Sequence, residues 1–343
     1  MFTFISMKKY GCLILFFLCF YADIQAQTIQ IVQQDTACSI RGLSVVNDEV
    51  AWVSGSKGYV AISVNGGKTW KWQQVKGFEQ SDFRDVEAFS AKEAIIMSSG
   101  TPALILKTND AGESWKVVYR NDDKAYFLDA MAFANDKTGY VLGDPIDRSF
   151  LLLKTVDGGN SWQLLPNLPQ ALPGEAAFAA SGTCLQVSQN TVKIVTGGSV
   201  AHLIFKSLEE EMWRAVELPI RHGLQSQGAF SIASGKNSVI IVGGDYVKKS
   251  ENDSVAVRSD QNSDQLNLKV LNNGPAGFQS CVAYLKDSVF LSTGTSGSNL
   301  TTNGGINWKQ IDATSFNVCQ KARHGKLVLL AGDKGKIAKL IIN

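Results

Sequence analysis

The chain repeats the sequence Thr155-Val156-Asp157-Gly158-Gly159-Asn160-Ser161-Trp162 along its length. Full near-copies end at Trp70, Trp115 and Trp308, and a shortened copy ends at Trp213. All full copies fit the pattern S/T-x-D/N-x-G-x-x-W. Successive tryptophans are separated by 45, 47, 51 and 95 residues, so that the last gap spans two repeats. Such a period is typical of propeller arrays, in which each repeat forms one blade.

Each residue type in the motif suits a tight turn between two strands. The Asp or Asn side chain accepts hydrogen bonds from nearby backbone amides, and glycine reaches the positive φ angles that such turns require. The Trp then begins the next strand and buries its ring against the neighbouring sheet, with an indole N–H that needs a partner. We therefore interpret the motif as a structural turn that performs no chemistry.

The segments between the motifs are short apolar or alternating runs, and no long stretch has a helical period. With four strands in each blade and the motif turn between the third and fourth, the blades fall at 40–76, 82–120, 126–166, 174–218, 226–271 and 277–311. The fifth blade lacks the motif, and we expect Leu266 or Leu268 in place of its Trp.

A seventh blade is predicted from the two ends of the chain. Residues 315–343 supply three strands, and residues 28–32 supply a lone fourth strand. Joining them closes the ring and removes open sheet edges. We therefore predict an all-β, seven-bladed β-propeller with Asp-box repeats, forming a single domain over residues 27–343; six or eight blades are the alternatives.

The first 26 residues have the pattern of a secretory signal peptide. Lys8 and Lys9 precede an apolar run over residues 12–21, and a small residue, Ala26, ends the segment. This order predicts cleavage after Ala26 and export to the periplasm or the cell exterior. Because the apolar run is too short to cross a bilayer, we expect no integral membrane span in the mature chain.

Composition argues against several classes of partner. The chain has 33 Lys and Arg against 31 Asp and Glu, so no overall field attracts nucleic acid, and we expect none as a partner. No dinucleotide-binding glycine motif, haem or iron–sulfur pattern or zinc spacing occurs, which predicts neither cofactor nor metal. Cys281 and Cys319 occupy matching places in adjacent blades, where a disulfide is conceivable and two buried thiols are favoured. We expect a monomer.

The first strand of each propeller blade lines the central channel, and the loops that lead into it form the usual binding face. Aligning the blades gives one polar residue at the start of each inner strand: Arg41, Arg84, Asp129, Glu175, Gln227, Gln279 and Asn317. A loop after a second strand adds Asp245 and Tyr246. We predict that this face binds the ligand. The alternative is that the two arginines only neutralise Asp129 and Glu175.

Glycoside hydrolysis is the competing function, because the Asp-box also occurs in glycosidases. A glycosidase needs two placed carboxylates, and the candidates are Asp85, Asp129, Asp144 and Glu175. A sialidase is disfavoured, because Ser39-Ile40-Arg41-Gly42 lacks the N-terminal arginine motif of that family.

From about residue 28 to 343 the chain resembles the bacterial relatives of the photosystem II stability/assembly factor, which are exported propellers with BNR-like (Asp-box) repeats. The resemblance rests on the Asp-boxes and on residues 127–133, 143–145, 174–183, 243–246 and 294–297. It implies a binding or assembly module for a protein or glycan ligand rather than an enzyme. Relatives sometimes carry the label of oxidoreductase, and nothing in this sequence supports that label.

Overall fold

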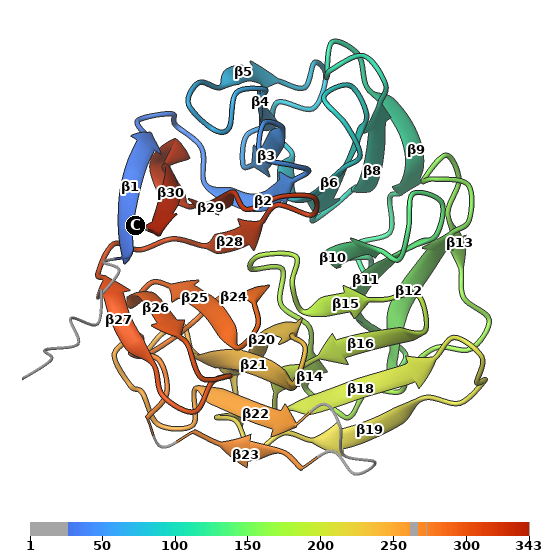
Figure 1. Ribbon diagram of the computed structural model, residues 1–343. Coiled ribbons are helices and arrows are strands. Elements are labelled where there is room, and N and C mark those ends of the chain that lie inside the picture. The colour runs from blue at the N-terminus through green and yellow to red at the C-terminus, as the bar shows by residue number, and fades with distance from the viewer. Residues whose placement is uncertain (1–26, 261–266, 272, 343) are drawn as a thin grey trace, which may run out of the picture.

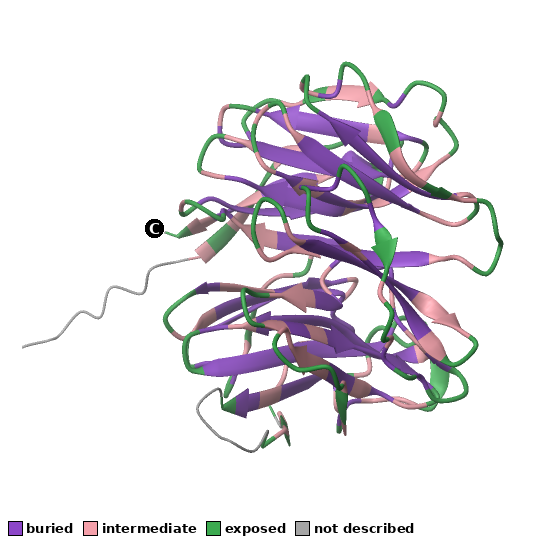
Figure 2. Ribbon diagram, turned by 90° about the vertical axis from the view of Figure 1, so that its right-hand side faces the viewer, coloured by how far each residue is buried: buried purple, intermediate pink, exposed green. Residues whose placement is uncertain are grey.

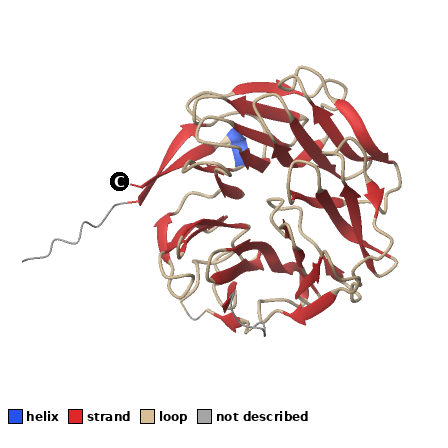
Figure 3. Ribbon diagram, turned by 45° about the vertical axis from the view of Figure 1, so that its right-hand side comes forward, coloured by secondary structure: helices blue, strands red, loops and turns tan. Residues whose placement is uncertain are grey.

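The computed structural model describes residues 27–260, 267–271 and 273–342. The predicted signal peptide at residues 1–26 lies outside the described residues. Seven antiparallel sheets surround a common axis, which confirms the predicted seven-bladed propeller (Figure 1). Strands make up nearly all the regular structure, and the helix in the described ranges is the 3-10 turn η1 (Asp333–Gly335) (Figure 3).

The strands of each blade follow one another outward from the channel. Blade 1 contains β2 (Ile40–Val45), β3 (Ala51–Gly55), β4 (Tyr59–Ser63) and β5 (Lys71–Gln74). Blade 2 contains β6 (Asp82–Ala88), β7 (Ala94–Ser99), β8 (Ala103–Thr108) and β9 (Lys116–Asn121). Blade 3 contains β10 (Leu128–Phe133), β11 (Gly139–Ile146), β12 (Ser149–Thr155) and β13 (Gln163–Leu164). Blade 4 contains β15 (Leu185–Val187), β16 (Thr191–Val195), β18 (His202–Ser207) and β19 (Arg214–Glu217).

The remaining blades follow the same order. Blade 5 contains β20 (Leu224–Ser234), β21 (Ser238–Asp245), β22 (Ala256–Asp260) and β23 (Lys269–Val270), with β14 (Glu175–Ala176) and β17 (Gly197–Gly198) added inside β20. Blade 6 contains β24 (Cys281–Lys286), β25 (Val289–Gly294), β26 (Gly297–Thr301) and β27 (Lys309–Asp312). Blade 7 contains β28 (Val318–Lys321), β29 (Val328–Ala331), β30 (Ile337–Ile342) and β1 (Gln27–Gln33).

The ring closes as predicted, through a strand from the start of the chain. β1 pairs antiparallel with β30, from Gln27 opposite Ile342 to Gln33 opposite Ile337. Figure 1 shows β1 in blue beside the red strands of the same blade. Blade 7 is therefore the one blade whose third and fourth strands are not consecutive in sequence.

The Asp-box motifs form the predicted turns between third and fourth strands. In blade 3 the Thr155 hydroxyl donates to Asp157 Oδ1 at 2.8 Å and accepts from Gly159 N–H at 2.9 Å. The backbone N–H and the hydroxyl of Ser161 both donate to the Asp157 carboxylate, at 3.0 and 2.6 Å. These hydrogen bonds, that of the Ser161 hydroxyl first, lower the pKa of Asp157 to about 2.

The indole N–H groups of the motifs differ from the expectation. Trp70 donates to the carbonyl of Gly67 at 3.1 Å. The indole nitrogens of Trp115, Trp162 and Trp308 are buried without a partner within the described part of the chain. Packing therefore holds these three rings, for example at 5.9 Å and 88° to Phe133 in the case of Trp162.

Each Asp-box also packs on the blade before it. The second glycine of the motif has a positive φ of 77° at Gly159, where an added Cβ would lie 2.2 Å from Ile95 Cδ1 on β7. The corresponding glycine of blade 6, Gly305, approaches Ile240 on β21 in the same way. The apolar side chains between blades are almost fully buried (Figure 2). The motif thus joins a local turn to the contact between neighbouring sheets.

Blade 4 starts later than predicted. The prediction begins this blade at residue 174 and places Glu175 at the start of its first strand, whereas the strand begins at Leu185 and Glu175 belongs to the sheet of blade 5. Residues 177–184, which we call the plug, instead cross the channel. The Ser181 hydroxyl donates to the carbonyl of Ser280 on blade 6, and Thr183 donates to Ser231 of blade 5. Small side chains allow this backbone to enter the narrow centre of the ring.

In the fifth blade, the third and fourth strands pair although the Asp-box motif is missing. β22 ends at Asp260 and β23 begins at Lys269, and Leu268 packs against the cluster of buried residues shared by blades 3, 4 and 5. Leu268 therefore takes the inward place expected of it, and Leu266 lies outside the described residues.

We expect Gly159→Ala to destabilise the protein by about 2 to 3 kcal/mol, because the new Cβ both strains a positive φ and displaces Ile95. Gly77→Ala is the matched control: its φ is 83°, and an added Cβ meets nothing within 4 Å. This control should cost about 1 kcal/mol or less. Urea denaturation of both variants measures the difference, and equal losses would contradict the proposed contact between blades.

Candidate binding site at the channel mouth

Four inner strands carry a β-bulge, which lies near the first residue of the strand in blades 1, 2 and 3 and in the middle of β20 in blade 5. The pairing with the second strand shifts between Ile40 and Gly42, Phe83 and Asp85, Leu128 and Ala130, and Ala229 and Ser231. The extra residues are Arg41, Arg84, Asp129 and Phe230. A bulge leaves one residue outside the ladder and redirects its side chain. Four side chains from blades 1, 2, 3 and 5 are thereby turned toward one end of the channel.

These side chains meet in a pocket of about 460 Å³, which we call the mouth pocket. Its lining includes residues of blades 1, 2, 3, 5, 6 and 7 and of the plug, as expected for a site on the propeller axis. Five residues of the predicted binding face line it: Arg41, Arg84, Asp129, Tyr246 and Asn317.

One side of the mouth pocket is aromatic. The rings of Phe178 and Phe230 stack at 3.8 Å and 8°, and Phe278 meets Phe230 edge-on at 4.8 Å. Tyr246 extends this cluster, at 6.2 Å from Phe230, and its side chain is exposed. Sequence reasoning missed the three phenylalanines. The signal available was the Phe beside the predicted polar residue in several blades, at Phe278 for instance.

The opposite side of the pocket is cationic. Arg84 donates to Asp82 at 2.8 Å, lies 5.9 Å from the ring centre of Phe127, and donates to the plug carbonyl of Ala179. Arg41 donates only weakly, to the carbonyl of Ala180 at 3.4 Å, and no carboxylate of the described residues lies within 4.0 Å of its guanidinium. Burial first, and then the neighbouring charge of Arg84, lowers the pKa of Arg41.

The alternative in which the arginines merely neutralise Asp129 and Glu175 therefore does not describe the pocket, because Arg84 pairs with Asp82 instead. A desolvated guanidinium without a carboxylate is a ready partner for an anionic group of a ligand.

Asp129 presents buried carboxylate oxygens to the same pocket. Both oxygens lack any hydrogen-bond partner among the described residues, and the residue is fully buried. Burial, followed by the nearby charge of Asp144 and against the opposing effect of Arg84, raises the pKa of Asp129 well above its ordinary value. The hydroxyl of Thr295, across the pocket on blade 6, is likewise buried and without a partner within the described ranges. Such groups are costly unless a ligand satisfies them.

The other four predicted site residues do not line the mouth pocket, and their side chains form hydrogen bonds within the protein. Glu175 accepts hydrogen bonds from Leu172 N–H and the Thr196 hydroxyl and faces His202 Nδ1 at 2.9 Å. Its predicted place on the inner strand of blade 4 is wrong, because the plug occupies that position. The remaining three, Gln227, Asp245 and Gln279, are buried and outside the mouth pocket.

These three residues bond to the protein itself. Gln227 donates to Asp245 Oδ2 at 3.0 Å, and Asp245 Oδ1 accepts from Val247 N–H at 2.9 Å. Gln279 donates to the carbonyl of Phe278 and accepts from Asn299. Their side chains position the loops that carry Tyr246 and Phe278 and are not free for a ligand.

The carboxylates proposed for a hydrolase are distributed over different surroundings. Asp85 accepts from Met131 N–H at 2.7 Å and Val86 N–H at 2.8 Å, and burial raises its pKa well above the ordinary value. It lies against the plug, since a Cβ on Gly182 would be 2.3 Å from its Oδ2. Asp144 and Glu175 line an adjoining pocket of about 560 Å³, where Glu175 is fully bonded as described. Only Asp129 of the four lines the mouth pocket.

The described residues offer few groups for disulfide or metal chemistry. Cys281 and Cys319 are both free and buried, as in the favoured prediction. Within the described residues, no group of three or more His, Cys, Asp or Glu side chains could hold a metal ion. None of the helices in the described ranges is long and apolar enough to cross a membrane.

The chain was compared with protein families and with known proteins. The family model described as photosynthesis system II assembly factor YCF48 matches residues 22–121 and 100–215. No curated protein matches the sequence.

Several solved structures are similar over nearly their whole length. YCF48 bound to a D1 peptide has 15% identity and a TM-score of 0.66, covering 92% of this chain and 97% of that one. YCF48 from Cyanidioschyzon merolae has 14% identity and a TM-score of 0.64, with coverage of 91% and 98%. Virginiamycin B lyase from Staphylococcus aureus has 12% identity and a TM-score of 0.63, with coverage of 92% and 99%. At these identities the likeness establishes the fold alone.

We expect Asp129→Asn to be more stable than the wild type at neutral pH. Because the folded pKa of Asp129 is raised, the folded protein binds a proton that the unfolded chain releases above about pH 4, so wild-type stability falls as the pH rises through that range. The Asp129→Asn side chain does not titrate, so the variant does not lose stability in this way. The difference in unfolding free energy between the two proteins should vanish toward about pH 4. Urea denaturation across the pH range measures the difference.

Asp85→Asn is the matched control, because Asp85 is equally inaccessible but its oxygens accept two backbone N–H groups. The raised pKa of Asp85 gives its Asn variant a similar gain at neutral pH, but an amide can accept at only one of these positions, so this variant should be less stable than Asp129→Asn across the pH range. A destabilised Asp129→Asn variant at neutral pH would show that the Asp129 carboxylate has partners in the protein.

Proposed function

Because the chain belongs to the photosynthesis system II assembly factor YCF48 family, we propose that it is a protein-binding assembly scaffold whose mouth pocket takes a segment of a partner protein. A structure of the same fold carries the description of YCF48 bound to a D1 peptide, which supports a peptide as the kind of ligand. We define the partner of this chain only by the chemical groups that the mouth pocket would bind.

The observation that carries the proposal is the combination of groups in the mouth pocket. Arg41 and Arg84 offer charged donors, Asp129 and Thr295 offer buried polar atoms without partners, and Phe230 lies at the centre of an aromatic cluster. A peptide supplies all the complementary groups at once: a carboxylate or carbonyl, a backbone N–H and an apolar side chain. The stacked faces of Phe178 and Phe230 cover each other and leave less ring surface for a sugar.

The glycosidase alternative gains no support from this arrangement. A glycosidase needs two carboxylates placed on either side of the scissile bond. The mouth pocket has Asp129 and Asp333 in its lining, and Asp333 accepts hydrogen bonds from Ser39 and Asn317. Binding without turnover is the simpler function for these groups.

Export belongs to the same proposal. The strand that closes the ring covers Gln27–Gln33, and Gln27 is both the first described residue and the residue after the predicted cleavage site at Ala26. Cleavage there would leave β1 whole, whereas a later cut would remove residues that pair with β30. The processing site and the closing strand are therefore compatible.

We expect the protein from an envelope or secreted fraction of its native cells to begin at Gln27. N-terminal sequencing or intact-mass measurement tests this, with the cytoplasmic fraction analysed in parallel. A chain that keeps residues 1–26 and stays in the cytoplasmic fraction would contradict export.

We expect Arg41→Ala/Arg84→Ala to weaken peptide binding at least tenfold, because each arginine contributes a charge-assisted hydrogen bond of about 1.5 to 3 kcal/mol. Short random peptides are selected against the wild-type chain by phage display. The best synthetic peptide is then titrated against both proteins by fluorescence anisotropy, after circular dichroism has shown that both are folded.

Arg120→Ala/Arg214→Ala is the matched control, because both arginines are exposed in outer strands away from the mouth. It should bind the peptide like the wild type. Equal affinity of all three proteins would exclude the mouth pocket as the site. Release of reducing sugar from a glycan panel, lost in Asp129→Asn, would favour the hydrolase instead.

A further inference from the structure

A second pocket lies on the opposite face of the propeller, between blades 6 and 7. The mouth pocket is formed near the first residues of the inner strands, whereas this pocket includes Lys286 and Lys321, the last residues of β24 and β28. Its volume is about 800 Å³, within the range of ligand sites. We call it the seam pocket, because β30 in its lining pairs with the closing strand β1.

The seam pocket exists because blade 7 has no Asp-box turn. In the four blades with a full motif, the turn covers the second strand of the preceding blade: Gly67 lies against Leu329, Trp115 against Trp52, Gly159 against Ile95 and Gly305 against Ile240. The third and fourth strands of blade 7 are β30 and β1, which come from opposite parts of the chain. Among the residues that the structure describes, no such turn therefore covers β25 of blade 6, and Val289 at its start lines the seam pocket.

The floor of the seam pocket is aliphatic. Leu285 and Val289 come from blade 6, and Leu327, Val328, Leu340 and Ile342 come from blade 7. Ile342, the last described residue, is 46% exposed. An apolar hollow of this size that no described residue covers is typical of a binding surface rather than of a scattered exposed residue.

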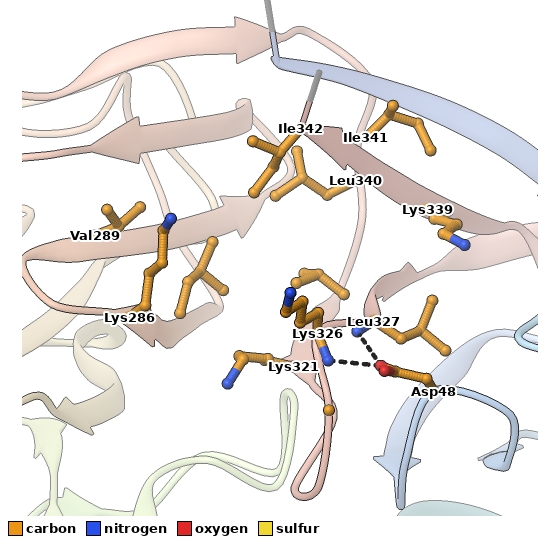
Figure 4. A pocket seen from close by; sticks show the side chains of 13 residues that line it. Asp48, Lys286, Val289, Lys321, Lys326, Leu327, Lys339, Leu340, Ile341 and Ile342 are labelled. Atoms are coloured by element: carbon orange, nitrogen blue, oxygen red, sulfur yellow. Dashed lines mark hydrogen bonds between the residues drawn. The ribbon is translucent and has the colours of Figure 1, made fainter. Parts of the chain in front are cut away.

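Four lysines surround this floor: Lys286, Lys321, Lys326 and Lys339 (Figure 4). None of the four ammonium groups has a carboxylate within 4.0 Å among the residues that the structure describes. The one acidic residue of the lining, Asp48, accepts hydrogen bonds from the backbone N–H groups of Lys326 and Leu327 at 2.5 and 2.7 Å. The charge around the pocket is therefore strongly positive.

We propose that the seam pocket binds an anionic amphiphile, namely an aliphatic chain that carries a carboxylate or phosphate head. The aliphatic floor takes the chain, and the lysines at the rim meet the head. A lysine ammonium is a flexible point charge that accommodates either kind of head.

The lining favours such a molecule over a protein segment. An extended peptide is recognised through hydrogen bonds to its backbone, usually at an open strand edge. The outer edge of β30 is already paired with β1, and the side chains of the floor have no polar atoms. A single aliphatic chain needs no hydrogen bonds along its length and leaves no polar group unsatisfied.

The experiment uses decanoate and decyl phosphate as probes, below the concentrations at which they form micelles. Isothermal titration calorimetry should show binding of both probes to the mature wild-type chain, and decyl maltoside, which has the same tail and a neutral head, should bind at least tenfold more weakly. Lys326→Gln/Lys339→Gln should weaken binding of the anionic probes about tenfold or more, given about fivefold for each lysine near an anionic head. Lys116→Gln/Lys137→Gln, two exposed lysines of blades 2 and 3, is the matched control and should bind like the wild type.

A second variant tests the shape of the seam pocket separately from its charge. Val289→Trp keeps every lysine and fills the hollow, so it should abolish probe binding while leaving attraction to an anionic surface intact. Cosedimentation with phosphatidylcholine vesicles, with and without phosphatidylglycerol, provides that comparison. Binding of the wild type to anionic vesicles without binding of monomeric probes would overturn the pocket in favour of a membrane-facing surface. Absence of binding both to the probes and to the vesicles, or equal loss in the Lys116→Gln/Lys137→Gln control, would overturn the proposal altogether.

Discussion

The whole structure depends on the need of every blade to have a neighbour on both of its faces. The buried clusters run across blade boundaries: one contains residues of blades 6, 7 and 1 together, among them Leu291, Leu329 and Ala61. A row of such sheets cannot end without exposing an apolar face, so the row must close into a ring. Pairing of β1 with β30 provides the closure, and it makes blade 7 the only blade assembled from both ends of the chain.

The mouth pocket follows from a local break in the same regular pattern. In an uninterrupted strand, side chains alternate between the two faces of the blade and therefore between two buried interfaces. The bulges at Arg41, Arg84, Asp129 and Phe230 add one residue each, so that these side chains leave the interfaces and point along the channel. A desolvated Arg41 and an unsatisfied Asp129 reduce the stability of the empty protein. Sites that lower stability in this way are expected where binding has been selected.

Much of the fold could be predicted from the sequence, because the Asp-box is a local structure. Its hydrogen bonds join residues within five positions, such as Thr155 and Gly159, so the motif marks the same turn in each blade wherever it occurs. The starts of the inner strands followed from this register, which is why Arg41, Arg84 and Asp129 were identified. The plug was not, since Glu175 aligns with the first residues of the other inner strands, whereas the contacts that hold residues 177–184 across the channel come from blades distant in sequence, such as Ser181 with Ser280. Phe230 was missed for a similar reason: the bulge shifts the register of β20 and turns Phe230 toward the mouth, whereas the predicted Gln227 is buried against Asp245.

The two pockets share a physical origin, although they lie on opposite faces. In a blade that keeps the regular pattern of strands and turns, the backbone groups are paired and the apolar faces are buried. Few groups therefore remain for a ligand to contact. The mouth pocket forms where the plug replaces the start of an inner strand and where bulges interrupt the ladders. The seam pocket forms where ring closure replaces the Asp-box turn. In this propeller, the positions at which the repeat fails are therefore the ones at which the two pockets form, and the Asp-boxes are informative chiefly because they make those failures visible.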